Sequence, residues 1–335
     1  MPDQHFKRIL NLLRKVEARR VVLLCHHNAD PDAICSAYAF SVLLNEVQPD
    51  LKVVIAAAQG VSKLSRQILK YIPMQIEASP RIEEVDAIFL LDTSTVQQLD
   101  EWKKTVENSE RPIIVIDHHA THPHTQNRAA ICVTDDTASS TCEIVFRLFK
   151  QAKVKLRRSE ALALFLGILY DTKHFILATS ETFRIISDLV NAGVNAEEAI
   201  SILALPTENS ERFARLKAAS RLRIVRIGEW ILVLSFISSY QASAARALIS
   251  LGAHVAIVGG QKKGKLMVSM RASNDFCQKT GIHLGKSIAK PLENYVQGMG
   301  GGHDAAAGFN GEGELENALE SCTKLLREAL KSLAA

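Results

Sequence analysis

A histidine and two aspartates lie close together in the stretch HHNADPD, residues 26–32. An apolar run, residues 21–25, precedes it and predicts a buried strand, while Asp30 suits the N-cap of a following helix. Carboxylates and an imidazole held this close destabilise one another unless a cation neutralises them. Oxygen ligands with one imidazole suit Mn²⁺ or Mg²⁺ better than Zn²⁺, so His26, Asp30 and Asp32 are candidate metal ligands. A helix cap beside a polar loop histidine is the plainer alternative.

Two later apolar runs also end in acidic or imidazole groups. Residues 85–91 predict a strand that is followed by Asp92, and residues 112–116 predict another that is followed by Asp-His-His at 117–119. Open α/β sheets place their ligand sites beyond the carboxyl ends of the strands. A lone aspartate after a strand is commonly a turn residue or a helix cap, but three strand ends that agree predict one shared site.

A further aspartate, Asp171, ends a strongly apolar predicted helix, residues 159–170. The helix macrodipole disfavours a negative charge at this end, so a bound cation explains Asp171 better than helix stability does. Together with the strand-end residues it gives too many ligands for one ion and about enough for two. Two divalent ions roughly 3.5–4 Å apart are a standard arrangement for phosphoester hydrolysis.

The elements that must position these residues predict an α/β fold. The chain has 335 residues, which is too many for one comfortable core, so two domains are expected. Strands and helices alternate in the first part, which predicts a mostly parallel sheet covered by helices, and hairpins in the last part predict a smaller α/β domain. We place the domains at residues 1–205 and 223–335, with a helical linker at 206–222.

Local composition predicts four elements near the candidate residues. Residues 121–128 are polar and predict a loop, and residues 137–150 predict a helix with Thr137 as its cap. A helix is expected near residues 284–296. The glycine-rich stretch that follows predicts a loop.

Composition places the chain among ordinary globular proteins, with 47% hydrophobic and 23% charged residues. Its net charge of +4 is compatible with a phosphorylated substrate but is far from a basic nucleic-acid tail. The six cysteines form no C-x-x-C pair, which favours reduced thiols in a cytoplasmic protein. We see no signal peptide and no apolar run long enough to span a bilayer, so no membrane partner is expected.

Taken together, the motifs resemble the DHH phosphoesterase superfamily. His-x-x-x-Asp-x-Asp-Ala at 26–33, Asp92, Asp-His-His at 117–119 and Tyr-Asp-Thr at 170–172 occur in the family's order. Gly-Gly-Gly-His at 300–303 resembles the signature of the DHH-associated C-terminal domain. The resemblance covers nearly the whole chain and is closest to the branch of nanoRNases and adenosine 3′,5′-bisphosphate phosphatases.

The resemblance implies a role for each metal-site residue. Two divalent ions, Mn²⁺ with Mg²⁺ as the alternative, would share the site. The first would be bound by His26, Asp30 and Asp92, and the second by Asp32, Asp92, His118 and Asp171, so that Asp92 would bridge them. Asp117 would orient His118, and His119 would face the scissile phosphate or its leaving group.

The second domain offers candidate substrate-binding residues. Glycines let backbone N–H groups approach an anion closely, and Arg271 could add a charged contact, although a tight turn is the commoner meaning of such glycines. In the family this motif holds a terminal phosphate or nucleotide. The resemblance therefore implies the same role for Gly300, Gly301, Gly302 and His303.

We expect a Mn²⁺-dependent phosphoesterase that hydrolyses short oligonucleotides, adenosine 3′,5′-bisphosphate, or both, by a two-metal mechanism. One alternative is a single-strand-specific exonuclease on longer DNA or RNA, which should need a basic track and stacking aromatics. Others are a cyclic-dinucleotide phosphodiesterase and a non-catalytic binding module, against which the complete ligand set argues. Short oligonucleotides or small nucleotides are the expected partners, and a homodimer stays open.

Overall fold

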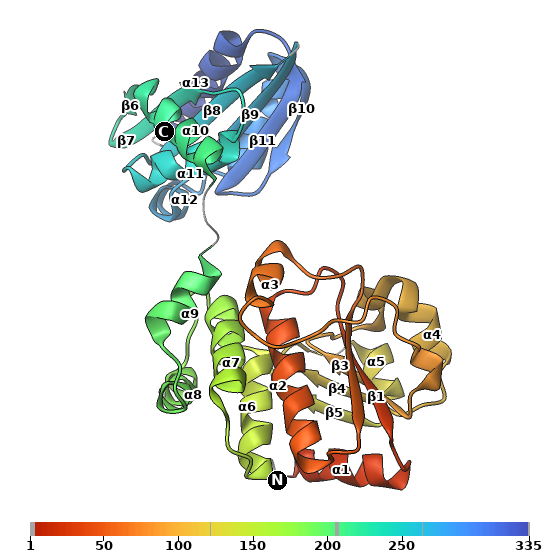
Figure 1. Cartoon of the computed structure of the whole chain (residues 1–335). Helices are drawn as coiled ribbons and strands as arrows, with labels where there is room; N and C mark the ends of the chain where they lie inside the picture. Colours follow the sequence, from red (N-terminus) through yellow and green to blue (C-terminus); the bar gives the residue numbers. More distant parts are fainter. Residues whose placement is uncertain (1–3, 121, 205–207, 263, 334–335) are drawn as a thin grey trace. The chain divides into compact units, whose positions relative to one another are not determined.

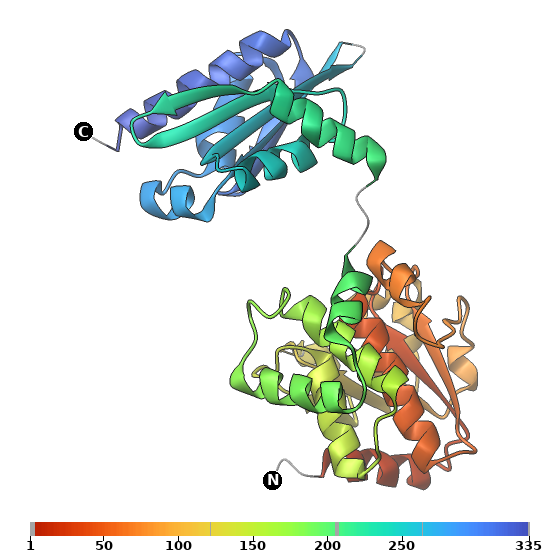
Figure 2. The same ribbon diagram turned by 60° about the vertical axis from the view of Figure 1, so that its left-hand side comes forward.

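The computed structural model describes residues 4–120, 122–204, 208–262 and 264–333. The chain divides into two compact units, Met1–Leu205 and Pro206–Ala335, which Figures 1 and 2 show from two directions. The first contains a parallel sheet with helices, and the second contains a mixed sheet with helices. The predicted α/β class is confirmed for both.

A five-stranded sheet with strand order β2-β1-β3-β4-β5 forms the centre of the first unit (Figure 1). Every neighbouring pair is parallel. Its three middle strands are almost wholly buried, as the continuous apolar runs predict for a sheet that is covered on both faces. The strands are β1 (Arg20–Cys25), β2 (Lys52–Ala57), β3 (Ala87–Leu91), β4 (Ile113–Asp117) and β5 (Ile131–Thr134).

Two long helices, α2 (Pro31–Val47) and α6 (Thr141–Ala152), pack on one face of this sheet, and a third, α7 (Arg158–Asp171), packs on both of them. Helix α2 is buried around most of its circumference, because α6 and α7 contact it as well as the sheet. The opposite face packs against the η2 (Val96–Trp102) and α4 (Lys103–Asn108) segments. The other helical segments here are α1 (His5–Lys15), α3 (Lys63–Ile68), η1 (Ile82–Glu84), α5 (Pro123–Arg128), α8 (Ser180–Asn191) and α9 (Ala196–Leu203).

Two local predictions in the first unit are wrong. Residues 123–128 form the short helix α5 instead of a loop. Helix α6 begins at Thr141, because the Ser140 hydroxyl accepts a hydrogen bond from Glu143 N at 3.2 Å. Thr137 is no cap, since its hydroxyl donates to Asp135 Oδ1 at 2.6 Å.

A six-stranded mixed sheet with order β10-β11-β9-β8-β7-β6 forms the second unit. Its strands pair antiparallel except for β7 with β8. They are β6 (Arg223–Ile227), β7 (Trp230–Phe236), β8 (Val255–Lys262), β9 (Lys265–Ala272), β10 (Gln297–Gly302) and β11 (Ala306–Glu312). The helical segments are α10 (Asn209–Ser220), α11 (Gln241–Ser250), α12 (Asn274–Thr280), η3 (Gly285–Ala289), η4 (Pro291–Asn294) and α13 (Leu315–Lys331).

The segment expected to be a linker contains α10, which packs through Ala214 and Ala218 into a core shared with α11 and the sheet. The helix expected near 284–296 is instead a π-helical turn, η3, followed by the 3₁₀ turn η4. Among the described residues, no helix is both long enough and apolar enough to cross a membrane.

The glycine-rich stretch forms the hairpin of β10 and β11, so the predicted loop is wrong. A Cβ on Gly300 would collide with the carbonyl oxygen of Ala289, and one on Gly285 would collide with that of Gly302. Glycine is therefore needed at these positions because η3 rests directly on β10, a contact that composition does not reveal.

Candidate metal centre

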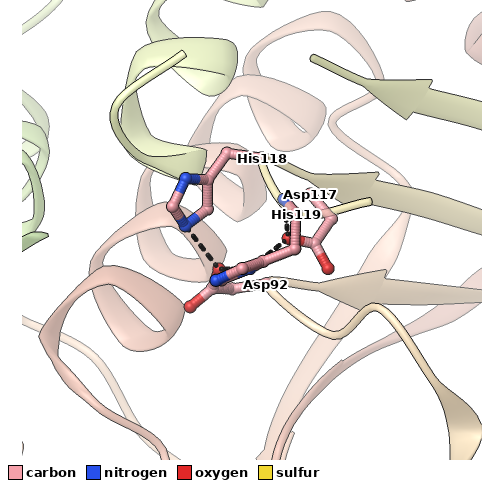
Figure 3. Close-up of side chains that lie close together, drawn as sticks. All are labelled: Asp92, Asp117, His118 and His119. Carbon is pink, nitrogen blue, oxygen red and sulfur yellow. Dashed lines mark hydrogen bonds and ion pairs between the residues drawn. The ribbon is translucent and has the colours of Figure 1, made fainter. Parts of the chain in front are cut away.

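The polar residues beyond the carboxyl ends of β1, β3 and β4 converge with the ends of two helices. Within each of three groups, one potential ligand atom per residue lies within 4.8 Å of the others. The groups are His26, Asp30 and Asp92; Asp32, His118 and Asp171; and Asp92, Asp117, His118 and His119 (Figure 3). All six residues predicted as metal ligands belong to these groups.

The first group joins the end of β1 to the end of β3. His26 Nε2 lies 3.8 Å from Asp30 Oδ1 and 3.8 Å from Asp92 Oδ2. Asp30 also caps α2, because its Oδ1 accepts hydrogen bonds from Asp32 N at 3.0 Å and Ala33 N at 3.2 Å. The cap that the sequence predicts and a ligand role are therefore compatible in one residue.

The second group joins α2, the end of β4 and the end of α7. His118 Nε2 lies 3.1 Å from Asp171 Oδ2 and 3.7 Å from Asp92 Oδ1. The contact with Asp171 is close but poorly aligned, so this buried nitrogen has no hydrogen-bond partner among the described residues. Asp32 is completely buried beside it. A buried imidazole nitrogen that faces carboxylates without a hydrogen bond fits a site built for a cation.

Asp92 lies between the two groups and has an unusual backbone conformation. Its φ of 53° is in the left-handed region, which costs free energy for a residue other than glycine and is typical of functional sites. Its carboxylate is held by the hydroxyl of Thr141, which donates to Oδ1 at 2.9 Å. One carboxylate oxygen faces His26 and the other faces His118.

Titration shifts in the cluster follow from burial and from mutual repulsion. Burial, reinforced by the charges of Asp30, Asp117 and Asp171, raises the pKa of Asp92 to about 7. Burial and the neighbouring carboxylates also raise the pKa of Asp32 well above its ordinary value.

The pKa values of His26 and His118 are raised although burial by itself would lower them. Burial opposes their protonation, but the contacts of His26 with Asp30 and of His118 with Asp171 prevail and raise the pKa of each to about 9. Protons thus compensate the carboxylates in the absence of a cation. The oxygen-rich donor set with two imidazoles fits divalent ions such as Mn²⁺.

Asp117 has a different partner from the one that we expected. Its Oδ1 accepts a hydrogen bond from His119 N at 2.9 Å and lies 2.9 Å from His119 Nδ1. Figure 3 shows the side chains of Asp117 and His119 next to each other. An aspartate readily bonds the backbone two residues ahead, and this turn brings the ring of His119, not that of His118, to the carboxylate. His118 is instead positioned by Ala138 O, 3.4 Å from its Nδ1, and by Thr141. The side chain of His119 is 58% exposed and can therefore reach a ligand.

Sequence reasoning missed the residues that hold Asp32. The backbone N–H groups of Thr141 and Cys142 donate to Asp32 Oδ2 at 2.6 Å and Oδ1 at 3.0 Å. The first N–H groups of a helix have no partner within it, and here they bind a buried carboxylate. The Ser and Thr residues before α6 indicate a helix start, but they do not reveal which group its N-terminus binds.

The candidate substrate residues all lie in the second unit. Arg271 in β9 pairs with Ala306 of β11, and Gly302 of β10 pairs with Ala307. Arg271 is half-buried and donates from Nη1 to Met270 O at 2.8 Å. The adjacent strands therefore bring Arg271 and the glycine motif, with His303 just after it, to one end of the sheet.

Gly301 differs from the glycines on either side of it. A Cβ on Gly301 would meet no atom within 4 Å, whereas Gly300 and Gly302 lie against backbone atoms. Packing therefore explains Gly300 and Gly302 but not Gly301.

Comparison with known proteins identifies the family of this chain. The model of the DHH family, N-terminal domain, matches residues 20–168, and that of the DHHA1 domain matches residues 241–332. An uncharacterized protein of Methanocaldococcus jannaschii is 36% identical over 332 residues, which cover 96% of this chain and 95% of that protein. The chain belongs to the DHH family, whose members are metal-dependent phosphoesterases and related hydrolases. The predicted family and class of enzyme are confirmed.

Two further relatives are informative. A "probable bifunctional oligoribonuclease and PAP phosphatase" of Streptococcus mutans is 27% identical over 182 residues, 53% of this chain and 55% of that protein. The crystal structure of an exopolyphosphatase-related protein from Bacteroides fragilis has the same fold, with a TM-score of 0.64 and 21% identity. That match covers 99% of this chain and 98% of the other.

Proposed function

We propose that this protein hydrolyses phosphoester bonds in short oligonucleotides, in small nucleotides such as adenosine 3′,5′-bisphosphate, or in both, with two divalent ions, preferably Mn²⁺. The observation that carries the proposal is the place of Asp92 between two groups of ligands, with one oxygen facing each histidine. The similarity to the oligoribonuclease and PAP phosphatase of S. mutans supports the substrate class.

In this proposal the ligands form two sets that share Asp92, whose Oδ2 lies 3.8 Å from His26 Nε2 and whose Oδ1 lies 3.7 Å from His118 Nε2. His26 and Asp30 would complete the first set, and Asp32, His118 and Asp171 would complete the second. Divalent ions in such a site supply charge neutralisation at phosphate oxygens and a water molecule of lowered pKa as nucleophile. The chain contributes the preorganisation, because Asp30 and Asp32 are fixed by backbone N–H groups and Asp92 by the Thr141 hydroxyl.

His119 and Asp117 are suited to proton transfer near the reacting phosphate. The hydrogen bond with Asp117 raises the pKa of His119 despite partial burial. A protonated His119 keeps the proton on Nδ1 against Asp117 Oδ1 and leaves the N–H at Nε2 for a phosphate oxygen or a leaving-group oxygen. Asp117 in this proposal orients His119.

Arg271, the backbone around Gly301 and His303 would bind a phosphate that is remote from the reacting bond. A guanidinium forms charge-assisted hydrogen bonds with phosphate. The open side of Gly301, which packing does not require to be glycine, leaves room for close approach of an anion to the backbone. Such contacts favour substrates with at least two phosphates or phosphodiesters.

A substrate series tests the proposal. Purified protein with Mn²⁺ is incubated with adenosine 3′,5′-bisphosphate, a cyclic dinucleotide, and labelled RNA and DNA from about two to roughly twenty nucleotides, which brackets the site sizes of single-strand binders. We expect the highest kcat/KM for the bisphosphate or the shortest strands. A kcat/KM that rises steadily with strand length would indicate a longer-range exonuclease, and a clear preference for the cyclic dinucleotide would indicate a cyclic-dinucleotide phosphodiesterase.

A further inference from the structure

Thr141, the first residue of α6, contacts three of the candidate metal ligands. Its backbone N–H donates to Asp32 Oδ2 at 2.6 Å, and its hydroxyl donates to Asp92 Oδ1 at 2.9 Å. The same hydroxyl oxygen accepts a hydrogen bond from His118 N at 3.3 Å. One completely buried residue thus links ligands from the start of α2, the end of β3 and the end of β4.

The hydroxyl has a specific bonding pattern that a helix start does not require. Ser140 already serves as the N-cap, and Thr141 lies inside the helix, where a threonine hydroxyl commonly bonds the backbone of its own chain segment. Here the hydroxyl donates instead to the side chain of Asp92, which follows strand β3. A hydroxyl has a single hydrogen to donate, and here it is donated to Asp92 Oδ1. This hydrogen bond orients the carboxylate of Asp92 within the cluster.

The Asp32 carboxylate is closely packed against α7 as well as against the start of α6. Gly167 of α7 lies so close that a Cβ there would collide with Cys142 Sγ and would lie 2.8 Å from Asp32 Oδ1. Cys142 N donates to the same oxygen at 3.0 Å. Asp32 is therefore held from two sides, whereas Asp92, on a strained backbone, has the Thr141 hydroxyl as the side-chain donor that orients it.

We propose that Thr141 is a positioning residue that sets the spacing of Asp32 and Asp92 and thereby the affinity of both halves of the centre for divalent ions. Its amide fixes the first carboxylate and its hydroxyl fixes the second, so the two are held by one rigid helix start. The inference rests on the proposed function only insofar as the cluster binds metal. It requires no particular substrate.

The test measures binding of Mn²⁺ to the metal-free full chain by titration calorimetry, without an activity assay. Thr141→Val keeps the shape of the side chain and removes the hydroxyl, while Thr141→Ser keeps the hydroxyl and removes the methyl group. Thr125→Val is the matched control, because Thr125 is also buried in this unit but its hydroxyl accepts from Val96 N at 3.4 Å and belongs to no candidate ligand group. Thr141→Ala removes the same hydroxyl in a smaller side chain, should valine prevent folding.

We expect Thr141→Val or Thr141→Ala to weaken Mn²⁺ binding by about 10- to 100-fold, the range typical of residues that orient metal ligands. Thr141→Ser should bind nearly as wild type does, and Thr125→Val should not change the affinity. Unchanged affinity in the valine and alanine variants would overturn the proposal, as would an equal loss in Thr141→Ser, which would attribute the effect to packing. A wild-type chain that binds no Mn²⁺ would instead refute the proposed function.

Discussion

The Nε2 atom of His118 lies 3.1 Å from Oδ2 of Asp171, so the end of β4 meets the C-terminal end of α7. A negative charge at a helix C-terminus is unfavourable by itself. Here the imidazole compensates it, because the contact with Asp171 outweighs burial and raises the pKa of His118 to about 9. If these residues bind a divalent ion, as we propose, His118 must release this proton when the ion binds.

The first prediction is that binding of Mn²⁺ releases protons. At neutral pH the metal-free site holds protons on His26 and His118, with pKa values of about 9, and partly on Asp92, with a pKa of about 7. Because ligand atoms must be deprotonated, Mn²⁺ should bind more tightly as the pH rises from about 6 to about 8. The apparent dissociation constant should decrease by about tenfold per pH unit for each proton released. Calorimetry in buffers of different ionisation enthalpy counts these protons. An affinity independent of pH would contradict the assignment of these ligands.

The second prediction concerns Gly167, which lies behind Asp32. In Gly167→Ala the new methyl group must displace Cys142 Sγ or the Asp32 carboxylate. Overpacking of this kind costs about 1–3 kcal/mol, which exceeds the gain of about 1 kcal/mol that alanine brings to a helix. We expect a net loss of unfolding free energy of up to about 2 kcal/mol in urea titrations, together with weaker Mn²⁺ binding.

The double variant Gly167→Ala/Cys142→Ala is the control for that prediction. Removing Sγ takes away the closer of the two collisions, so part of the lost stability should return. A single Gly167→Ala variant with wild-type stability and wild-type Mn²⁺ affinity would show that the packing around Asp32 is looser than described.

The third prediction separates substrate binding from chemistry. Arg271→Ala should lower kcat/KM for a nucleotide substrate by roughly ten- to hundredfold, equivalent to about 1.5–3 kcal/mol for a lost charge-assisted contact. Mn²⁺ affinity should not change, because every candidate ligand lies in the other unit. The loss should shrink for a p-nitrophenyl phosphodiester, which has no remote phosphate.

Arg223→Ala is the matched control, since Arg223 lies in the same unit in an exposed ion pair with Glu316 at 3.4 Å. This variant should keep full activity on both substrates. Equal losses on the nucleotide and the minimal substrate in Arg271→Ala would assign Arg271 to folding or to the chemical step instead.

Much of the site could be predicted because the signal for it is local. An apolar run followed at once by Asp92, or by Asp117 and His118, indicates a strand and its polar end without knowledge of the rest of the chain. Parallel pairing then brings these ends together at one edge of the sheet. The α/β class and the convergence of the ligands at the strand ends follow from this rule, whereas Asp171 lies at the end of helix α7 and needed the separate argument from the helix macrodipole.

The remaining features depend on contacts between distant segments. Several hydroxyl residues in the stretch 137–141 could cap a helix, so the sequence does not decide between a start at 137 and one at 141. In the structure the helix starts at Thr141, and the Asp32 carboxylate accepts hydrogen bonds from Thr141 N and Cys142 N at that start. Whether Asp117 contacts the ring of His118 or that of His119 depends on the geometry of the turn, which the residue types do not determine. Gly300 likewise has its reason in Ala289, a residue of another element.

Hydrolysis of a short RNA with Mn²⁺, compared between wild type and Asp92→Asn, tests the central claim most directly. Asparagine keeps the size of the side chain but removes the charge that both ligand sets share, so kcat/KM should fall by at least about a hundredfold, beyond the loss typical of residues that only support a ligand. Asp188→Asn, which changes an exposed aspartate paired with Lys150, should retain wild-type activity. Near-normal hydrolysis by Asp92→Asn would contradict a metal centre organised around Asp92.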